Sequence, residues 1–161
     1  MIIQHKLEIL SQIAKKLNEG HITWAVGGSL LLYFKGIVDE FHDIDLMVHA
    51  DDAEEAKSLL MEMGELQKPA YENPYKADHF YVFLVEDVEV DLMGGFTILK
   101  ADGEHRCFLR KEDIYEKVLV DGEQIPLHSL TEWRRYYELM GRSAKVKMID
   151  DAEKNMEEDS K

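Results

Sequence analysis

The stretch Trp24–Ser29, WAVGGS, ends a short apolar run with two glycines and a serine, and a second apolar run, Leu30–Phe34, follows at once. Glycines after a strand let the backbone approach a phosphate closely, and the free amides at the start of a helix favour an anion. The same pattern also fits a tight turn in which Ser29 caps the helix. The choice between these interpretations depends on a second stretch, His42–His49, HDIDLMVH.

This second stretch carries two acidic residues on one face of an expected strand. Side chains alternate along a strand, so Asp43 and Asp45 share one face, while the apolar residues that alternate with them share the other. A later β-rich run, Val88–Met93, repeats the arrangement with Glu89 and Asp91 on one face. If the two strands are neighbours in one sheet, Asp91 joins Asp43 and Asp45.

Three converging carboxylates are hard oxygen ligands that suit Mg²⁺ or Mn²⁺. Two such ions about 3.5–4 Å apart can activate an attacking oxygen and neutralise a leaving phosphate. Two like charges about 4 Å apart repel by about 4 kcal/mol at an effective dielectric constant near 20, and cations would relieve this repulsion. The alternative is that the acids simply face solvent from a half-covered sheet. In that case Asp91 would lie more than about 10 Å from Asp45, too far to share one metal site.

The remaining sequence predicts a mixed fold of helices and strands. Helical spacing of apolar residues predicts four helical regions, and β-rich runs predict two hairpins. We therefore expect an α+β fold, an α/β sandwich with a mixed sheet of about five strands flanked by helices, in one domain over residues 1–161. The expected features are helices over Ile3–Leu17, Leu30–Phe34, Ala53–Met63 and from about Ser129, hairpin turns at Glu86-Asp87 and Asp121-Gly122, an edge strand at Pro126, a surface loop over Glu65–Ala77 and a fraying acidic tail over 153–161.

Composition limits the classes of partner. The formal net charge of −14 argues against general nucleic-acid binding, which depends on Lys and Arg, and it fits a cationic substrate or metal ions as well as mere solubility. Cys107 is the only cysteine, the N-terminus lacks the pattern of a signal peptide, and no apolar run reaches the roughly 18 residues that span a bilayer. We therefore expect a cytoplasmic protein without membrane association, and its oligomeric state stays open.

The spacing of the two motifs resembles the signature of the nucleotidyltransferase superfamily, typified by DNA polymerase β. Gly27-Gly28-Ser29 is followed by thirteen residues and then by Asp43-Ile44-Asp45-Leu46, with Asp91 in a later β-run. The segment Ile125–Ile149 also resembles the closing segment of small members, in which a strand ending in Pro leads to a helix, then Gly-Arg and a Lys. These small members include antibiotic-modifying and toxin–antitoxin nucleotidyltransferases.

The resemblance implies transfer of a nucleoside monophosphate from a nucleoside triphosphate such as ATP to an acceptor hydroxyl, with two Mg²⁺ or Mn²⁺ ions. By position, Gly27, Gly28 and Ser29 would hold the triphosphate, and the carboxylates Asp43, Asp45 and Asp91 would be the catalytic residues and metal ligands. Asp91 would either ligate the catalytic metal or draw the acceptor proton. Arg142 and Lys145 would approach the phosphates, although both residues also fit an exposed helix terminus.

The resemblance leaves the acceptor open. The acceptor can be a small molecule such as an antibiotic, an RNA or a protein, and the acidic charge slightly favours a small cationic molecule. We expect no separate acceptor-binding domain after the C-terminal helices. The alternative function is a nucleotide-binding or toxin–antitoxin regulatory module that has kept the fold but lost catalysis.

Overall fold

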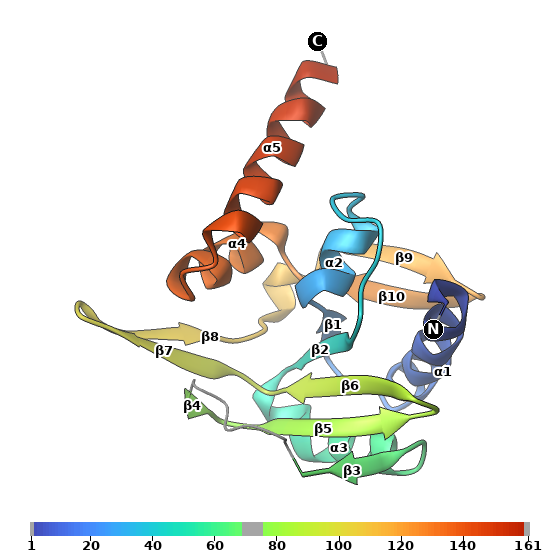
Figure 1. The fold of residues 1–161 in the computed structure, drawn as a ribbon. Helices are drawn as coiled ribbons and strands as arrows, with labels where there is room; N and C mark the ends of the chain where they lie inside the picture. The colour runs from blue at the N-terminus through green and yellow to red at the C-terminus, as the bar shows by residue number, and fades with distance from the viewer. Residues whose placement is uncertain (1, 69–75, 160–161) are drawn as a thin grey trace.

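A computed structural model describes residues 2–68 and 76–159 of the protein (Figure 1). Its helices are α1 (Ile3–Glu19), α2 (Gly28–Phe34), α3 (Ala53–Met61), α4 (Leu130–Leu139) and α5 (Ser143–Asp159), with short 3-10 helices at Ala50–Asp52 and Lys111–Asp113. Its strands are β1 (Trp24–Val26), β2 (Ile44–Val48), β3 (Glu65–Gln67), β4 (Lys76–Ala77), β5 (Phe80–Val85), β6 (Val88–Met93), β7 (Phe96–Lys100), β8 (Gly103–Cys107), β9 (Glu116–Val120) and β10 (Glu123–Leu127).

The described strands form a mixed sheet in the order β3-β5-β6-β2-β1-β10-β9 and a smaller sheet in the order β4-β7-β8. In the large sheet β2 runs parallel to β6 and β1 runs parallel to β10, and the other pairs are antiparallel. The predicted α+β class is confirmed, and the main sheet has seven strands rather than about five. The surface loop expected over Glu65–Ala77 has β3 and β4 at its ends, and its central part, 69–75, lies outside the described residues.

Helices cover both faces of the large sheet. Figure 1 shows α1 and α3 together on one side of it and α2 and α4 on the other. Strand β2 is buried on both faces: Ile44, Leu46 and Val48 are buried on one face, and on the other Met47 is fully buried and Asp45 is partly buried. All five described helices contribute to one hydrophobic cluster, and Leu10, Leu31, Leu60, Trp133 and Ile149 are representative buried members.

Both predicted hairpin turns are confirmed. Glu86 and Asp87 have φ angles of 44° and 73° between the paired residues that end β5 and begin β6. Asp121 and Gly122 have φ angles of 49° and 83° between β9 and β10. Positive φ at both central residues is the geometry of the primed two-residue turn.

The prediction that Pro126 lies in an edge strand is wrong. Strand β10, which contains Pro126, lies between β1 and β9, and β9 forms the edge. Proline is tolerated there because the register of β1 with β10 consists of a single pair, Val26 with Leu127, so Pro126 has no partner residue on that side. On the other side Pro126 is paired with Lys117 of β9.

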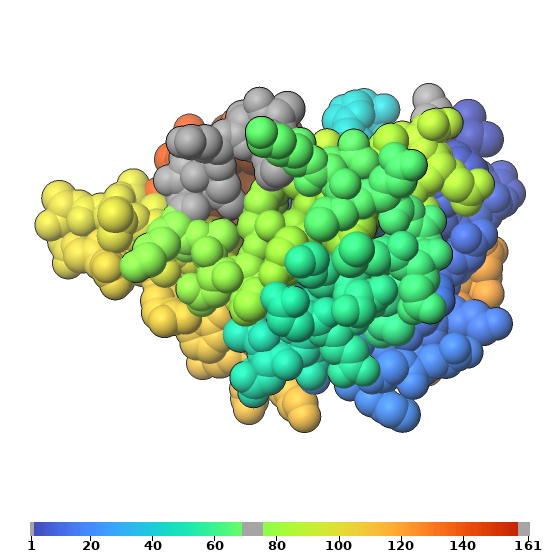
Figure 2. All heavy atoms as spheres, turned by 90° about the horizontal axis from the view of Figure 1, so that it is seen from below, coloured from blue at the N-terminus to red at the C-terminus, as the bar shows by residue number. Residues whose placement is uncertain are grey.

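Two elements extend from the body of the molecule. Helix α5 projects away from the sheets in Figure 1 and continues to Asp159, so fraying of its acidic end stays a prediction. The β7–β8 hairpin projects as an arm in Figure 2, and Leu99 near its end is 67% exposed. Within the described residues we find no helix that is both long enough and apolar enough to span a membrane.

Candidate active site

The parallel pairing of β2 with β6 brings the predicted acids together. Asp45 is the direct partner of Asp91, and Ile44 is the partner of Val90. Asp43, one position before Ile44, approaches Glu89, one position before Val90. The D-x-D pattern of β2 and the E-x-D pattern of β6 therefore lie side by side. Ligand oxygens of Asp43, Glu89 and Asp91 all lie within 4.8 Å of one another. The interpretation that the acids are separate, solvent-facing residues is therefore wrong.

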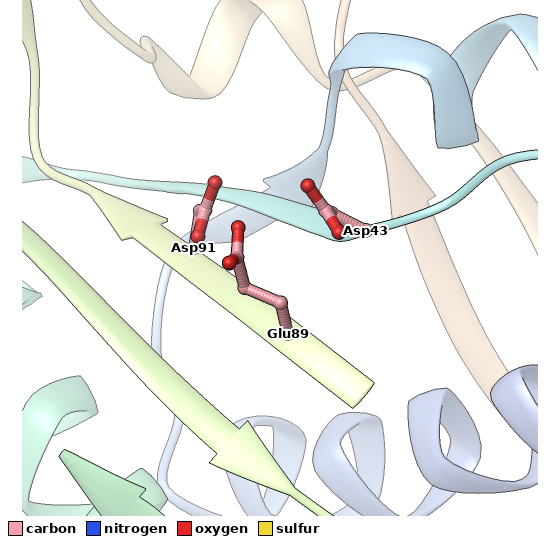
Figure 3. Close-up of side chains that lie close together, drawn as sticks. All are labelled: Asp43, Glu89 and Asp91. Carbon is pink, nitrogen blue, oxygen red and sulfur yellow. The ribbon is translucent and has the colours of Figure 1, made fainter. Parts of the chain in front are cut away.

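Glu89 is the acidic residue that sequence reasoning left out of the candidate site. Figure 3 shows the side chains of Asp43, Glu89 and Asp91 directed toward one shared space. The alternation along Val88–Met93 had already placed Glu89 on the face of Asp91. What the sequence did not provide was the register of β6 on β2, which places Glu89 next to Asp43.

The two glycines of the opening stretch are required by different contacts. A Cβ atom on Gly27 would overlap the indole ring of Trp133, which packs against the backbone at this point. Gly28 has a φ angle of +58°, a left-handed conformation that favours glycine, and a Cβ atom there would overlap the carboxylate of Asp45. The Gly27 amide also donates a hydrogen bond to the Asp45 carbonyl at 3.0 Å. The glycines therefore seat the turn directly against the acidic strand.

A cavity of about 490 Å³ opens beside this turn. It brings together Gly28, Ser29, the three predicted carboxylates, and both predicted basic residues, Arg142 and Lys145. Gly27 is not among the lining residues, because Trp133 packs against it. The rest of the lining is largely apolar or aromatic and consists of His42, Phe80, Met93, Phe96, Trp133, Tyr137 and Met140.

The two basic residues reach the cavity from the turn between α4 and α5 and from the start of α5. The Arg142 amide donates to the Tyr137 carbonyl at 2.8 Å, and its guanidinium lies 5.5 Å from the centre of the Tyr137 ring. The charge of Arg142 also acts on Asp45, where it lowers the pKa against the larger effect of burial. The cavity thus has an acidic wall at β2 and β6 and a basic wall at the α4–α5 turn and the start of α5.

Strand alternation alone would place His42 on the opposite face from Asp43, but His42 lines the cavity together with the acids. Strand β2 begins only at Ile44, so the alternation that holds from Ile44 onward does not extend back to His42. The chain before β2 is instead held by Lys6 of α1, whose ammonium donates to the Phe41 carbonyl at 2.7 Å. The charges of His42 and Lys6 both lower the pKa of Asp43, in opposition to burial.

The crowded carboxylates have raised pKa values. Burial, then the charges of Asp43 and Glu89, raise the pKa of Asp45 to about 7. Burial and the charge of Asp45 raise the pKa of Asp91 as well. Burial and the charge of Glu89 raise the pKa of Asp43. Each raised pKa means that burial and neighbouring negative charges together outweigh the nearby positive charges, because desolvation and like charges both disfavour the carboxylate form.

The residues fit a divalent cation. The Oδ1 atom of Asp91 is buried and has no hydrogen-bond partner among the described residues, although a buried carboxylate oxygen is normally paired. Nearby carboxylates supply only hard oxygen donors, which is the ligand chemistry of Mg²⁺ and Mn²⁺. The Oδ1 atom of Asp91 is therefore available as a ligand for a cation.

The mixed sheet flanked by helices and the acid-lined cavity agree with the resemblance to nucleotidyltransferases found in the sequence. A family model described as aminoglycoside-2''-adenylyltransferase matches residues 9–154. The chain therefore belongs to the aminoglycoside-2''-adenylyltransferase family, an assignment that confirms the resemblance found in its sequence. No curated protein matches the chain.

Solved structures share the fold. The chain superposes on TM1012 of Thermotoga maritima, a protein assigned as a nucleotidyltransferase, with a TM-score of 0.73. The two chains are 24% identical, and 94% of each is covered. ANT(2'')-Ia in complex with adenylyl-2''-tobramycin gives a TM-score of 0.56 at 10% identity over 94% of this chain and 99% of that one. The lincosamide antibiotic adenylyltransferase LnuA, bound to lincomycin, gives 0.57 at 14% identity over 89% and 95%.

Proposed function

We propose that the protein is a metal-dependent adenylyltransferase that moves the nucleoside monophosphate of ATP onto a hydroxyl group of a small, amine-bearing antibiotic. The observation that carries this proposal is the meeting of Gly28-Ser29, the acids of β2 and β6, and Arg142 with Lys145 around one cavity. Family membership supports the type of reaction. The acidic wall and the net charge of −14 favour a cationic acceptor over RNA.

In this proposal Asp43, Asp45 and Asp91 hold the metal ions, which, when bound, supply positive charge for the phosphates and activate the attacking oxygen. The Gly28-Ser29 turn holds the triphosphate through backbone amides and the serine hydroxyl. Arg142 suits paired contacts to phosphate oxygens, and Lys145 supplies a point charge, so both would stabilise the negative charge of the leaving pyrophosphate.

The acceptor hydroxyl would lie on the acidic side of the cavity, opposite the basic residues. Asp91, which lines the cavity, would either ligate the catalytic metal or take the proton of that hydroxyl. The apolar lining, with Phe80, Met93 and Phe96, would exclude water from the reacting groups. This arrangement suits a ring-shaped acceptor that combines apolar surface with ammonium groups.

The test is transfer of labelled AMP to a panel of acceptors in the presence of Mg²⁺ or Mn²⁺. The panel contains aminoglycosides, lincosamides and a transfer RNA, and adenylylated products are identified by mass spectrometry. We expect labelling of at least one aminoglycoside or lincosamide and none of the RNA. A paired Asp43→Asn, Asp45→Asn variant should lose activity by several orders of magnitude, because it removes two ligands of the metal ions.

A protein that binds ATP with Mg²⁺ but labels no acceptor would instead support the silent nucleotide-binding module. If neither metal changes the affinity for any triphosphate, and the paired variant binds nucleotide as the wild type does, the catalytic proposal fails. Labelling of RNA alone would replace the antibiotic with a nucleic-acid acceptor.

A further inference from the structure

We propose that Glu89 acts with Asp43 and Asp91 to hold one divalent cation before any nucleotide arrives. The inference rests on the proposed function and adds a fourth carboxylate to its metal site. It assigns Glu89 the role of loading the site with metal, so that the cation does not need to enter together with the triphosphate.

The first support is geometric. Ligand oxygens of Asp43, Glu89 and Asp91 lie within 4.8 Å of one another, whereas Asp45 is not a member of this group. Oxygens on opposite sides of one Mg²⁺ ion lie about 4.2 Å apart, twice the metal–oxygen distance. Small rotations of the three side chains would therefore close them around a single ion. Glu89 is the flexible member, because its side chain is the longest and it is only partly buried.

The second support is one unpaired oxygen atom of Asp91. This residue is only 8% exposed, and its Oδ1 atom has no hydrogen-bond partner among the described residues. Figure 3 shows its carboxylate directed into the space that Glu89 and Asp43 share. A buried, unpaired carboxylate oxygen is unfavourable unless a ligand meets it. This oxygen is therefore available to a cation held between the three carboxylates.

The third support is the distribution of charge. None of the three carboxylates forms an ion pair with a basic residue in the part of the chain that the structure describes. Lys6 acts on Asp43 from α1, but its ammonium donates to the Phe41 carbonyl. Arg142 acts on Asp45 from the opposite wall. A triphosphate would bring its own anionic oxygens to a metal, so a fourth protein carboxylate matters most while the triphosphate is absent.

The experiment measures Mn²⁺ binding to the full chain without nucleotide, by electron paramagnetic resonance of the free ion, and repeats the titration with ATP present. We expect the wild type to bind one Mn²⁺ tightly without ATP. Glu89→Gln keeps the shape of the side chain but removes its charge, and it should weaken this binding about tenfold or more, since even loss of an outer-shell partner costs about that much. With ATP present, Glu89→Gln should bind the metal nearly as the wild type does.

Three further variants separate the role of Glu89 from other effects. Glu89→Asp keeps a carboxylate and should restore much of the affinity. Glu104→Gln removes an exposed acid on β8 and should leave the titration unchanged. Asp45→Asn removes the carboxylate outside the three-member group, so it should weaken nucleotide-free binding less than Glu89→Gln does.

The inference is overturned if the wild type binds no Mn²⁺ at millimolar concentration without ATP, or if Glu89→Gln binds it as tightly as the wild type. Either result can occur while metal-dependent ATP binding by the wild type persists, and the proposed function then stands without this role of Glu89. Absence of metal-dependent ATP binding by the wild type would instead contradict the proposed function itself.

Discussion

Gly28 is the residue at which the turn and the acidic strand depend on each other most directly. Its backbone is left-handed, with φ +58°, and a methyl group there would overlap the Asp45 carboxylate. Gly36 has a similar φ of +74°, but a methyl group added there would have no atom within 4 Å. Gly36 is therefore a matched control that tests the backbone strain without the overlap. We expect Gly36→Ala to lower the free energy of unfolding by about 1 kcal/mol. Gly28→Ala should lower it by at least about 2 kcal/mol, because the overlap is added.

Gly28→Ala should also weaken metal-dependent nucleotide binding, since Asp45 has to move, whereas Gly36→Ala should not. Urea unfolding and calorimetric titration with ATP and Mg²⁺ measure the two effects. Equal loss of stability in both variants, with unchanged binding, would show that the contact between Gly28 and Asp45 is unimportant.

His128 gives the fold a dependence on pH that is separate from the acids. Its Nδ1 atom accepts a hydrogen bond from the Trp133 indole at 3.1 Å, and its Nε2 atom is buried without a partner among the described residues, with Asp113 3.9 Å away. Burial lowers the pKa of His128 to about 4, against the opposing charge of Asp113. The neutral ring is therefore favoured in the folded protein, and its contribution to stability is complete above the unfolded pKa of about 6.5.

That contribution is lost as the pH falls from about 6.5 toward 4, because the unfolded chain takes up the proton first. We expect His128→Gln, which keeps an acceptor for Trp133 and cannot be protonated, to remove this effect. Between pH 7 and pH 5 the wild type should lose about 2 kcal/mol of unfolding free energy relative to the variant. Chemical denaturation of both proteins at the two pH values measures the difference. Parallel losses in the two proteins would contradict the low pKa of His128.

At the scale of elements, helix α4 presents Trp133 and Tyr137 to the cavity. Its N-cap residue is Ser129. The Ser129 hydroxyl accepts a hydrogen bond from the Glu132 amide at 3.2 Å, as the S-L-T-E spacing predicts. Ser129→Ala should lower the free energy of unfolding by about 1 kcal/mol. Ser58→Ala is a suitable control, because Ser58 is exposed within α3 and donates to the Glu54 carbonyl instead of capping. Thermal unfolding of both variants tests this prediction, which fails if they are equally stable.

Elements with a local signal could be predicted from the sequence. Helix α1 has apolar residues at helical spacing, and the turn at Asp121-Gly122 has the residues that its backbone requires. Strands without such a signal were missed. Strand β3 is only three residues long, two of them exposed, and β4 has two residues, so neither shows alternation of apolar and polar residues.

The candidate site shows the same limit. The D-x-D pattern and Asp91 could be found because alternation along one strand is a local property. The position of Glu89 next to Asp43 could not, because it depends on the register between β2 and β6, which are far apart in sequence. Strand alternation also fails to predict the position of His42, because the start of β2 at Ile44 depends on how the preceding chain packs, with the Lys6 ammonium bound to the Phe41 carbonyl. Long-range packing determines both positions.

For the whole molecule, net charge is the property that most limits its partners. With 33 acidic residues against 19 Lys and Arg residues, the protein has a net charge that disfavours association with polyanions. We expect its dissociation constant for duplex RNA or transfer RNA to exceed about 10⁻⁴ M at physiological salt, weaker than ordinary non-specific binding. Filter binding measures this, with ATP and Mg²⁺ as a positive control for active protein. Micromolar binding of RNA would contradict the preference for a small cationic acceptor.

The packing of Trp133 against Gly27 has a practical consequence. The chain contains two tryptophans, and Trp24 donates to Asn18 of α1 on the face of the sheet away from the cavity, whereas Trp133 lines the cavity itself. In a Trp24→Phe protein the remaining indole would be an intrinsic fluorophore at the edge of the site. Its emission would change as metal, nucleotide and acceptor enter, so the order of their arrival could be followed optically, in real time and without an attached label.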